Sequence, residues 1–225
     1  MFARTDPAKG PGGISALIIE KDTPGFSFGT QEDKFGLRAD PTRELVFEDC
    51  RIPKENLLGK EGDVMKIFQA FGSMHILSQA AISTGLAQAA LDATVKYTKE
   101  RTVAGPNTLA NFESVQSTVT DMAAATEAAR LLAYRAALVE PKEGPDPAMF
   151  LGGILGPELA MDVTSKAIKL HGGYGCTKDF PVGRYFRDAK TLSLQPTADF
   201  VRTNVGKMLL GIPMGPPPKA GGPPK

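Results

Sequence analysis

A helical repeat of apolar residues begins near Gly62 and continues almost to the end of the chain, and it limits the possible folds more than any other feature. Alanine, leucine, isoleucine and methionine return every three or four residues, which is the spacing of one buried face of an α-helix. His171-Gly172-Gly173 is a typical helix end. The pattern predicts three long helices and two shorter ones, over residues 63–99, 112–139, 148–170, 181–190 and 197–210.

The first 58 residues have the pattern of strands instead. Apolar residues form a short run over 13–20 and alternate with polar residues over 26–29 and 43–52, with proline and glycine between these segments. Pro53 ends the last strand because proline has no N–H to donate. So few strands cannot close a sheet with two protected edges. Either they belong to a larger sheet, or other chains complete it.

Long helices after a strand-rich start predict a mainly α fold. We expect a C-terminal four-helix up-down bundle over residues 59–210, preceded by a partial β domain over residues 1–58. Residues 211–225 are mostly proline, glycine and lysine, which predicts a disordered tail. Periodicity alone leaves open whether such a bundle is an enzyme half, a scaffold or a dimerisation module.

The charge balance argues against several classes of partner. The net charge of the 225 residues is +1, and basic and acidic residues are interspersed, so we expect no nucleic acid partner. Cys50 and Cys176 are too few for a disulfide framework and fit no metal spacing, which predicts reduced thiols and no bound metal. No apolar run approaches the ~20 residues that span a bilayer, and the first residues do not form a signal peptide. We expect a cytoplasmic protein without membrane insertion.

Several local motifs occur in the order in which one known family has them. They include Gly-Ile-Ser-Ala and Lys-Asp-Thr-Pro-Gly in the strand region, Asn-Leu-Leu-Gly before the first long helix, and a glycine-rich turn near the end. The matching segments are residues 13–16, 20–25, 34–38, 42–47, 56–59, 85–92, 100–101, 121–123, 128–132, 171–175 and 187–190. Together they resemble the acyl-CoA dehydrogenases, over the end of their middle β domain and their C-terminal bundle.

The resemblance implies an FAD site that is assembled between subunits. Arg101 matches an arginine at the pyrophosphate of the cofactor, and a bidentate guanidinium suits that role. The alternative is a helix-end arginine that neutralises the helix dipole. Gln116 matches a glutamine that hydrogen-bonds the cofactor, and the alternative is a surface amide.

The glycine-rich turn is also implied to approach the dinucleotide. Gly172 and Gly173 allow backbone N–H groups to come close to phosphate oxygens, although a simple helix end would explain the same glycines. His171 by itself is more typical of a packing residue than of a catalyst. Lys169 stands where glutamine is common in the family. The remaining implied cofactor contacts are Thr197, which agrees with the family pattern, and Asp199, which replaces a glutamine or glutamate.

The proton acceptor of the family reaction is missing from its usual position. Gln195 stands where most members have glutamate, and a carboxamide cannot take the proton that is removed from the acyl thioester. Some relatives place the base on the first bundle helix, where His75 is the matching residue here. His75 can be a base near neutral pH, although a histidine among apolar neighbours is more often a packed residue. A carboxylate in the absent N-terminal part is the third possibility.

Three functions remain open at this point. The first is a flavin-dependent acyl-CoA dehydrogenase, as a fragment or half-enzyme that lacks the N-terminal domain. The second is an acyl-CoA flavoprotein repurposed for a different reaction, and the third is a non-catalytic partner subunit. The implied partners are an acyl-CoA substrate, an electron-transfer flavoprotein or similar acceptor, and either further copies in a homo-oligomer (a tetramer) or a chain that carries the missing domain. In a eukaryote the compartment would be the mitochondrial matrix.

Overall fold

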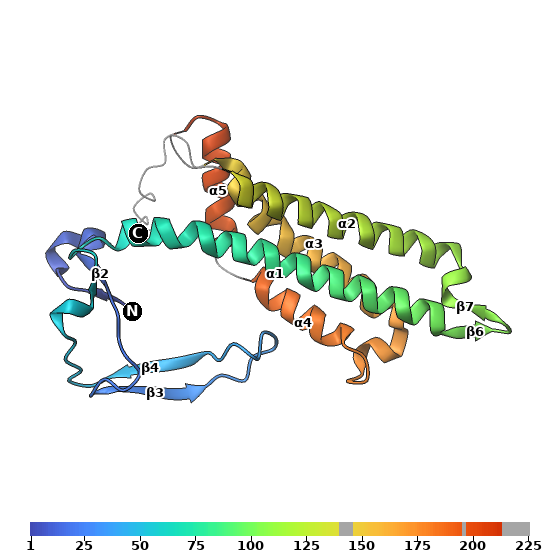
Figure 1. Cartoon of the computed structure of the whole chain (residues 1–225), viewed down its shortest axis with the longest axis horizontal. Helices are drawn as coiled ribbons and strands as arrows, with labels where there is room; N and C mark the ends of the chain where they lie inside the picture. Colours follow the sequence, from blue (N-terminus) through green and yellow to red (C-terminus); the bar gives the residue numbers. More distant parts are fainter. Residues whose placement is uncertain (140–145, 195–196, 213–225) are drawn as a thin grey trace, which may run out of the picture.

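A computed structural model describes residues 1–139, 146–194 and 197–212 of the chain. Three long helices, α1 (Val64–Glu100), α2 (Glu113–Leu138) and α3 (Pro147–His171), run up and down beside one another, and α4 (Val182–Ser193) packs on α1 and α3 (Figure 1). α5 (Thr197–Leu209) packs across α3. The predicted four-helix bundle is confirmed, and every predicted helix boundary lies within three residues of the observed one.

Small residues on the facing sides let the helices approach closely. At Gly153 of α3, an added Cβ would lie 2.3 Å from Ile76 Cγ2 and 3.0 Å from the Ile76 carbonyl oxygen of α1. The position therefore requires glycine for packing rather than for its backbone conformation. The centre of the core is likewise rich in alanine and contains Ala87, Ala90, Met122, Ala160, Val163, Ala167, Val182 and Ala189.

The strands that precede α1 form two separate antiparallel sheets. β1 (Phe2–Arg4), β2 (Ile14–Leu17) and β5 (Leu57–Leu58) pair in the order β1-β2-β5, while β3 (Phe26–Gln31) pairs with β4 (Arg43–Phe47). Two predicted strands were too long. β2 ends at Leu17 rather than near residue 20, and β4 ends at Phe47 because Asp49 turns the backbone with a positive φ of 46°. β1 and β5 were not predicted.

The predicted loop after α1 contains a small hairpin. β6 (Thr102–Ala104) pairs with β7 (Asn107–Thr108), and Gly105 makes the turn with a φ of +56°. Glycine suits this turn because it adopts positive φ without a steric cost. Short 3-10 turns complete the described elements: η1 (Pro7–Gly13), η2 (Lys54–Asn56), η3 (Leu109–Asn111) and η4 (Gly172–Cys176).

The loop between β3 and β4 docks on α4. The Leu37 N–H donates a hydrogen bond of 2.7 Å to Asp188 Oδ1, across 151 residues of sequence. Gly36 lies so close that a Cβ there would be 2.2 Å from the Arg187 carbonyl oxygen. This contact joins the strand region to the bundle, which lies above β3 and β4 in Figure 1.

The boundary at residue 58 stays a proposed domain division, with β5 before it and α1 soon after it. In the tail predicted over residues 211–225, the structure describes Gly211 and Ile212, and residues 213–225 lie outside the described part. Among the described helices, none is both long and apolar enough to span a bilayer.

Candidate functional site

One end of the bundle gathers most of the residues that the sequence singled out. α3 stops there because Gly172 has a φ of 59° and a ψ of −137°, a backbone conformation that is essentially restricted to glycine. The Gly172 N–H closes the last turn on the Lys169 carbonyl oxygen. α1 ends beside this turn at Glu100, which places Arg101 next to it.

His171 supports the turn from below. Its side chain is 2 % exposed, and its ring stacks on Tyr97 with centroids 4.2 Å apart. His171 Nδ1 lies 2.8 Å from the Ala167 carbonyl oxygen, so this nitrogen carries the proton and donates. Nε2 is buried without a hydrogen-bond partner among the described residues. Burial lowers the pKa of His171 below its ordinary value, because the charged imidazolium is poorly solvated there. The ring is therefore neutral and packed.

Arg101 and the two glycines face outward above that support. The Arg101 guanidinium lies over the Tyr174 ring, 5.4 Å from its centroid, and Tyr174 in turn meets the edge of Phe180. Gly172 and Gly173 are exposed, and a Cβ built on either would have no heavy atom within 4 Å. The turn thus leaves its backbone open to a bound group, beside a cation held in place by an aromatic ring.

Gln116 and Lys169 lie at this same end of the bundle. Gln116 begins the second turn of α2, and its Nε2 donates a 3.0 Å hydrogen bond to the Ala110 carbonyl oxygen. The Leu109 N–H donates to the Arg101 carbonyl oxygen at 2.9 Å, which ties the start of η3 to the end of α1. Lys169 is exposed on the last turn of α3. The arrangement offers cations, an amide and an exposed glycine backbone, which together suit an anion.

The other predicted site residues lie toward the opposite end. His75 is half-buried in α1, stacks on Phe71 at 6.0 Å, and lies 2.9 Å from Gln79 through the two Nε2 atoms. α5 packs nearby through Val201 and Val205 against Ile76 and Ile154. Thr197 begins α5 and Asp199 lies in its first turn, but their side chains are outside the described part, as is Gln195 entirely.

The two groups of residues do not meet within one chain. His75 and Arg101 are 26 positions apart, which at about 1.5 Å per residue corresponds to roughly 39 Å along α1. The structure therefore brings Arg101, Gln116, Lys169, His171, Gly172 and Gly173 to one end, and leaves His75 and α5 far from them.

The aromatic support of the site was not predicted. Tyr97 and Phe180 pack on His171, and Tyr174 meets Phe180 and lies under Arg101, with ring centroids 4.2 to 5.7 Å apart. One signal was available in the sequence. Tyr97 lies four residues before Arg101, on the same face of the helix, and Tyr174 lies inside the glycine-rich turn.

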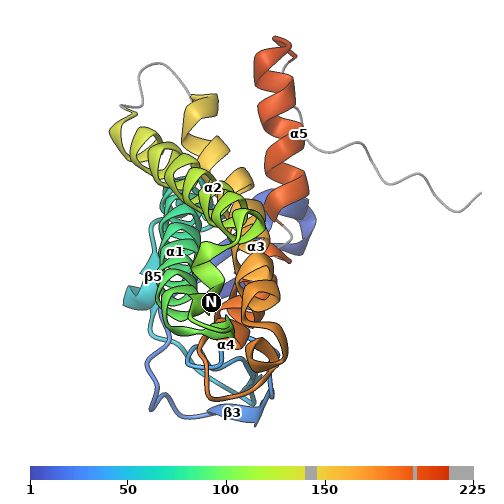
Figure 2. The ribbon, with the colours of Figure 1, turned by 90° about the vertical axis from the view of Figure 1, so that its right-hand side faces the viewer.

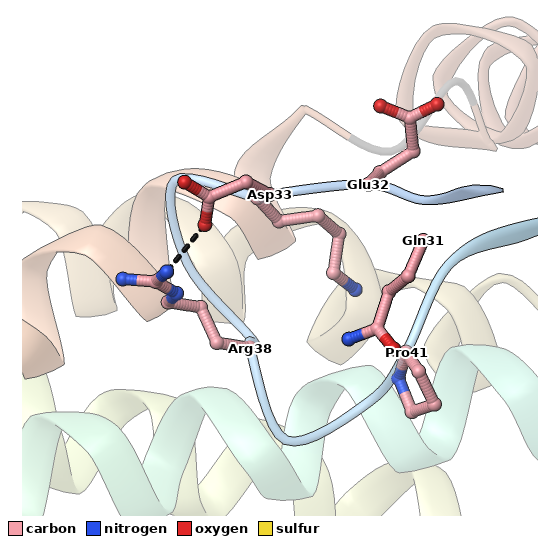
Figure 3. A pocket seen from close by; sticks show the side chains of 6 residues that line it. Gln31, Glu32, Asp33, Arg38 and Pro41 are labelled. Atoms are coloured by element: carbon pink, nitrogen blue, oxygen red, sulfur yellow. Dashed lines mark hydrogen bonds and ion pairs between the residues drawn. The ribbon is translucent and has the colours of Figure 1, made fainter.

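A shallow hollow at the tip of the β3–β4 loop contains none of the predicted residues. Gln31, Glu32, Asp33, Lys34, Arg38 and Pro41 line it, and Arg38 pairs with Asp33 (Figure 3). Within the described part of the chain, no three His, Cys, Asp or Glu side chains gather where they could hold a metal ion. Both acidic and basic side chains line the hollow, and this mixture does not indicate a particular ligand.

Several known proteins are similar to this chain in sequence and in structure. An acryloyl-CoA reductase (NADH) from Anaerotignum propionicum is 44 % identical over 193 residues, which are 84 % of this chain and 48 % of that protein. The butyryl-CoA dehydrogenase structure from Megasphaera elsdenii superposes with a TM-score of 0.87 at 38 % identity, over 93 % of this chain and 55 % of the other.

A third similarity is to a chain in a structure described as the electron transferring flavoprotein of Acidaminococcus fermentans. It has a TM-score of 0.88 at 42 % identity, over 93 % of this chain and 56 % of that one. The chain thus spans about half the length of the relatives that it matches.

The family model described as the acyl-CoA dehydrogenase C-terminal domain matches residues 70–195, more than half of the chain. This match covers most of α1 and all of α2, α3 and α4, including the turn at Gly172 and Gly173. The chain belongs to the acyl-CoA dehydrogenase family.

Proposed function

We propose that the chain forms the helical half of a flavin-dependent acyl-CoA dehydrogenase, which removes two hydrogens from the α and β carbons of an acyl-CoA thioester. The observation that supports this most directly is the open turn of Gly172 and Gly173 beside the exposed guanidinium of Arg101. That combination suits the phosphate groups of a dinucleotide such as FAD. When bound, FAD supplies the acceptor for the hydride from the β-carbon.

Each residue at this end has a distinct task in the proposal. Arg101 binds pyrophosphate oxygens through its guanidinium N–H groups, and Tyr174 limits the directions in which that group can move. The exposed backbone at Gly173 approaches the same anion, while the Gly172 N–H stays bonded to the Lys169 carbonyl oxygen. Gln116 and Lys169 border the site and supply an amide and a second cation. His171 holds the turn from beneath without touching the cofactor.

The separation of the two residue groups favours a site between chains. Because Arg101 and His75 are about 39 Å apart along α1, one end of a copy would meet the other end of a second molecule. We propose a homo-oligomer, a tetramer by family analogy, or a hetero-oligomer with a chain that carries the other half of the family fold. Thr197 and Asp199 would then contact a flavin whose pyrophosphate lies against another copy.

The proton acceptor is the part of the site that departs most from the family pattern. Gln195 can orient the thioester carbonyl or hold a water molecule, but it cannot accept the proton. His75 is the candidate base within this chain. Its Nε2 lies at hydrogen-bond distance from the Gln79 amide, so this contact must open before that nitrogen takes a proton.

Two alternatives follow from Gln195. The chain could be a non-catalytic partner subunit that completes the FAD pocket of another chain, or a flavoprotein repurposed for a different acyl-CoA reaction. The similarity to an acryloyl-CoA reductase supports the second alternative. An electron-transfer flavoprotein is the proposed electron acceptor, in line with the Acidaminococcus fermentans similarity. The proposed compartment is the cytoplasm, or the mitochondrial matrix in a eukaryote.

Flavin spectroscopy separates these possibilities. We expect the purified chain, alone or with a chain that supplies the other half, to bind added FAD and show an oxidised-flavin spectrum. Arg101→Ala should weaken FAD binding about tenfold to a hundredfold, because a charge-assisted contact is lost, and Arg101→Lys should lose less. Unchanged FAD affinity in Arg101→Ala would contradict the proposed site.

The reaction is tested on the flavin complex. Butyryl-CoA should bleach the flavin band of a dehydrogenase, while a non-catalytic subunit would bind FAD without bleaching. Acryloyl-CoA added to flavin that has first been reduced should restore the band in a repurposed reductase. Absence of flavin binding in every combination of subunits would rule out the dehydrogenase, the non-catalytic partner subunit and the repurposed flavoprotein alike.

A further inference from the structure

Gln79 of α1 is buried, although glutamine side chains are mostly exposed in proteins. It is 5 % exposed, and its Nε2 lies 2.9 Å from His75 Nε2, one turn earlier on the same face of the helix. Ser83 Oγ donates a 2.7 Å hydrogen bond to the Gln79 carbonyl oxygen. α1 packs against α2, α3 and α4 (Figure 2), and a buried amide is stable there only when it is hydrogen-bonded. The contact with His75 is therefore part of the packing of α1.

The His75 ring has a neighbour on each side along the helix. Phe71, one turn earlier, stacks on it with ring centroids 6.0 Å apart and an angle of 19° between the planes. Gln79, one turn later, meets the ring at Nε2. These two contacts set the direction of the ring, so what can still change is the position of its proton.

The donor and acceptor in this contact decide which nitrogen of His75 is basic. A neutral imidazole has one N–H and one lone pair, whereas a glutamine amide has an NH2 donor at one end and an oxygen acceptor at the other. The NH2 end of Gln79 faces the ring, so Nε2 accepts the hydrogen bond and the ring proton lies on Nδ1. Nδ1 then has its proton and the Nε2 lone pair is engaged. The ring takes up no further proton while this contact persists.

Rotation of the amide by half a turn reverses these roles. The two ends of an amide have nearly the same shape, so the reversal needs little extra space. Gln79 Oε1 then accepts a hydrogen bond from His75 Nε2–H, and the lone pair lies on Nδ1. A proton that leaves the α-carbon of a thioester can bond to Nδ1 in this state. Oε1 stabilises the resulting imidazolium through the same hydrogen bond.

We propose that Gln79 is a positioning residue for the base of the proposed reaction, because the orientation of its amide decides whether His75 can accept a proton. With its NH2 end toward the ring, Gln79 keeps His75 inactive, and with its oxygen toward the ring it makes His75 a base. The inference rests on the proposed function, to which it adds a residue that no local motif singled out.

No charged group of α1 competes with this amide, because residues 67–91 include no Asp, Glu, Lys or Arg. The described charged side chains on the parts of α2, α3 and α5 that pack at this level are Arg130, Arg135, Glu158, Arg202 and Lys207. Glu158 pairs with Arg202, and Arg130 pairs with Glu127. The two that remain are cations, which oppose a positive charge on the ring. Within this described set the amide oxygen is therefore the group that can favour the imidazolium.

The tautomer of His75 tests the proposal on the chain without flavin. The chain has two histidines, so ¹⁵N labelling of histidine gives a simple NMR spectrum in which protonated and bare ring nitrogens are distinguished. We expect the wild-type His75 to carry its proton on Nδ1. Gln79→Met keeps the length of the side chain but removes the amide, so both tautomers should appear. The same His75 tautomer in both proteins would overturn the proposal.

A carboxylate in place of the amide should fix the active state. In Gln79→Glu the proton should move to Nε2, and the midpoint of the His75 titration should rise by about one pH unit or more, because the carboxylate stabilises the imidazolium. Ala81→Glu is the matched control, since it adds the same charge at an exposed position on another face of α1. Equal shifts in the two variants would refute a specific role of Gln79. The His171 signals report whether each variant is folded, and Gln79→Met decides the matter if Gln79→Glu is not.

Flavin bleaching by butyryl-CoA tests the catalytic consequence. The rate should rise with pH as His75 loses its proton, and in Gln79→Glu this rise should move to higher pH. His75→Ala should remove the difference between the two profiles. Bleaching with the same pH profile in the wild type and in Gln79→Glu would show that Gln79 does not control the base. Absence of flavin binding would instead contradict the proposed function, while the ring tautomers of the free chain still decide whether Gln79 positions the His75 proton.

Discussion

His171 is the clearest case of a residue at the candidate site that packs beneath it, in line with the packing role that the sequence favoured. The sequence placed it at a turn near the cofactor, and the structure shows a neutral ring stacked on Tyr97 with its Nε2 buried. The buried Nε2 lacks a partner in the described structure, which carries a cost of about 1 to 3 kcal/mol for such a group. The ring nevertheless fixes the end of α3, on which the position of Gly172 depends.

Acid should destabilise the fold partly through His171. Its folded pKa is lowered by burial, so the unfolded chain binds this proton more readily, and the contribution of the neutral ring is present above about pH 6.5. It is lost as the pH falls below that value through the folded pKa. Denaturant unfolding measured at several pH values should therefore show a smaller loss of stability on acidification in His171→Phe. Equal slopes in both proteins would assign the acid sensitivity to other groups.

Gln195→Glu tests the missing base directly. If only the proton acceptor is absent, the new carboxylate should raise the rate of flavin bleaching by butyryl-CoA about 10²- to 10⁴-fold, the usual contribution of a general base. Gln195→Leu is the control, because it removes the amide without adding a base. A rate that stays the same in Gln195→Glu would argue for a base elsewhere, and His75→Ala would then be the next variant to measure.

At the scale of elements, the sequence predicted the helices well and the short strands badly. The helices are long enough for their period to be visible, and glycine marks the end of α3. β1, β5, β6 and β7 have only two or three residues each, which is too short for any alternation to be recognised. The candidate site likewise contains residues that the sequence predicted and residues that it did not. Arg101 and the glycines were identified from local motifs, whereas Tyr174 and Phe180 became neighbours only through packing.

Two glycine substitutions should have opposite effects on stability. Gly153→Ala places a methyl group against Ile76 and its carbonyl oxygen, so α1 and α3 must move apart, at a cost of about 1 to 3 kcal/mol. Gly85→Ala, in α1, meets nothing within 4 Å and should stabilise by about 0.5 to 1 kcal/mol, because alanine favours the helix. Thermal unfolding of both variants checks this. Destabilisation by Gly85→Ala would contradict the open space beside Gly85.

Considered as a whole, the molecule joins its strand region to the bundle through few contacts. β2 and β5 lie by the start of α1, while the β3–β4 loop reaches α4 through Leu37 and Gly36 (Figure 1). Leu37 adopts a φ of +51°, which is unfavourable for a residue with a Cβ, and its N–H donates a hydrogen bond to Asp188 in this conformation. The Asp188 carboxylate therefore helps to hold the β3–β4 ribbon in position, together with the close packing of Gly36 on Arg187.

Asp188→Ala should release this loop while leaving the bundle folded. The Leu37 N–H loses its acceptor, which should cost about 1 to 2 kcal/mol of local stability. Hydrogen exchange should accelerate over residues 33–41 and stay unchanged in the middle of α1. Asp162→Ala is a suitable control, because that carboxylate pairs with Lys166 on the surface of α3. Faster exchange throughout the bundle would show that Asp188 supports the whole fold instead.

α1 carries its 37 residues without interruption from the strand region to the far end of the bundle. In a continuous α-helix the rise and the rotation per residue are fixed. The length of α1 therefore sets both the distance and the relative rotation between the groups attached at its two ends. One residue inserted between His75 and Arg101 would turn everything beyond it by about 100°. Insertions and deletions among relatives should consequently occur in the connections between helices and be rare between His75 and Arg101.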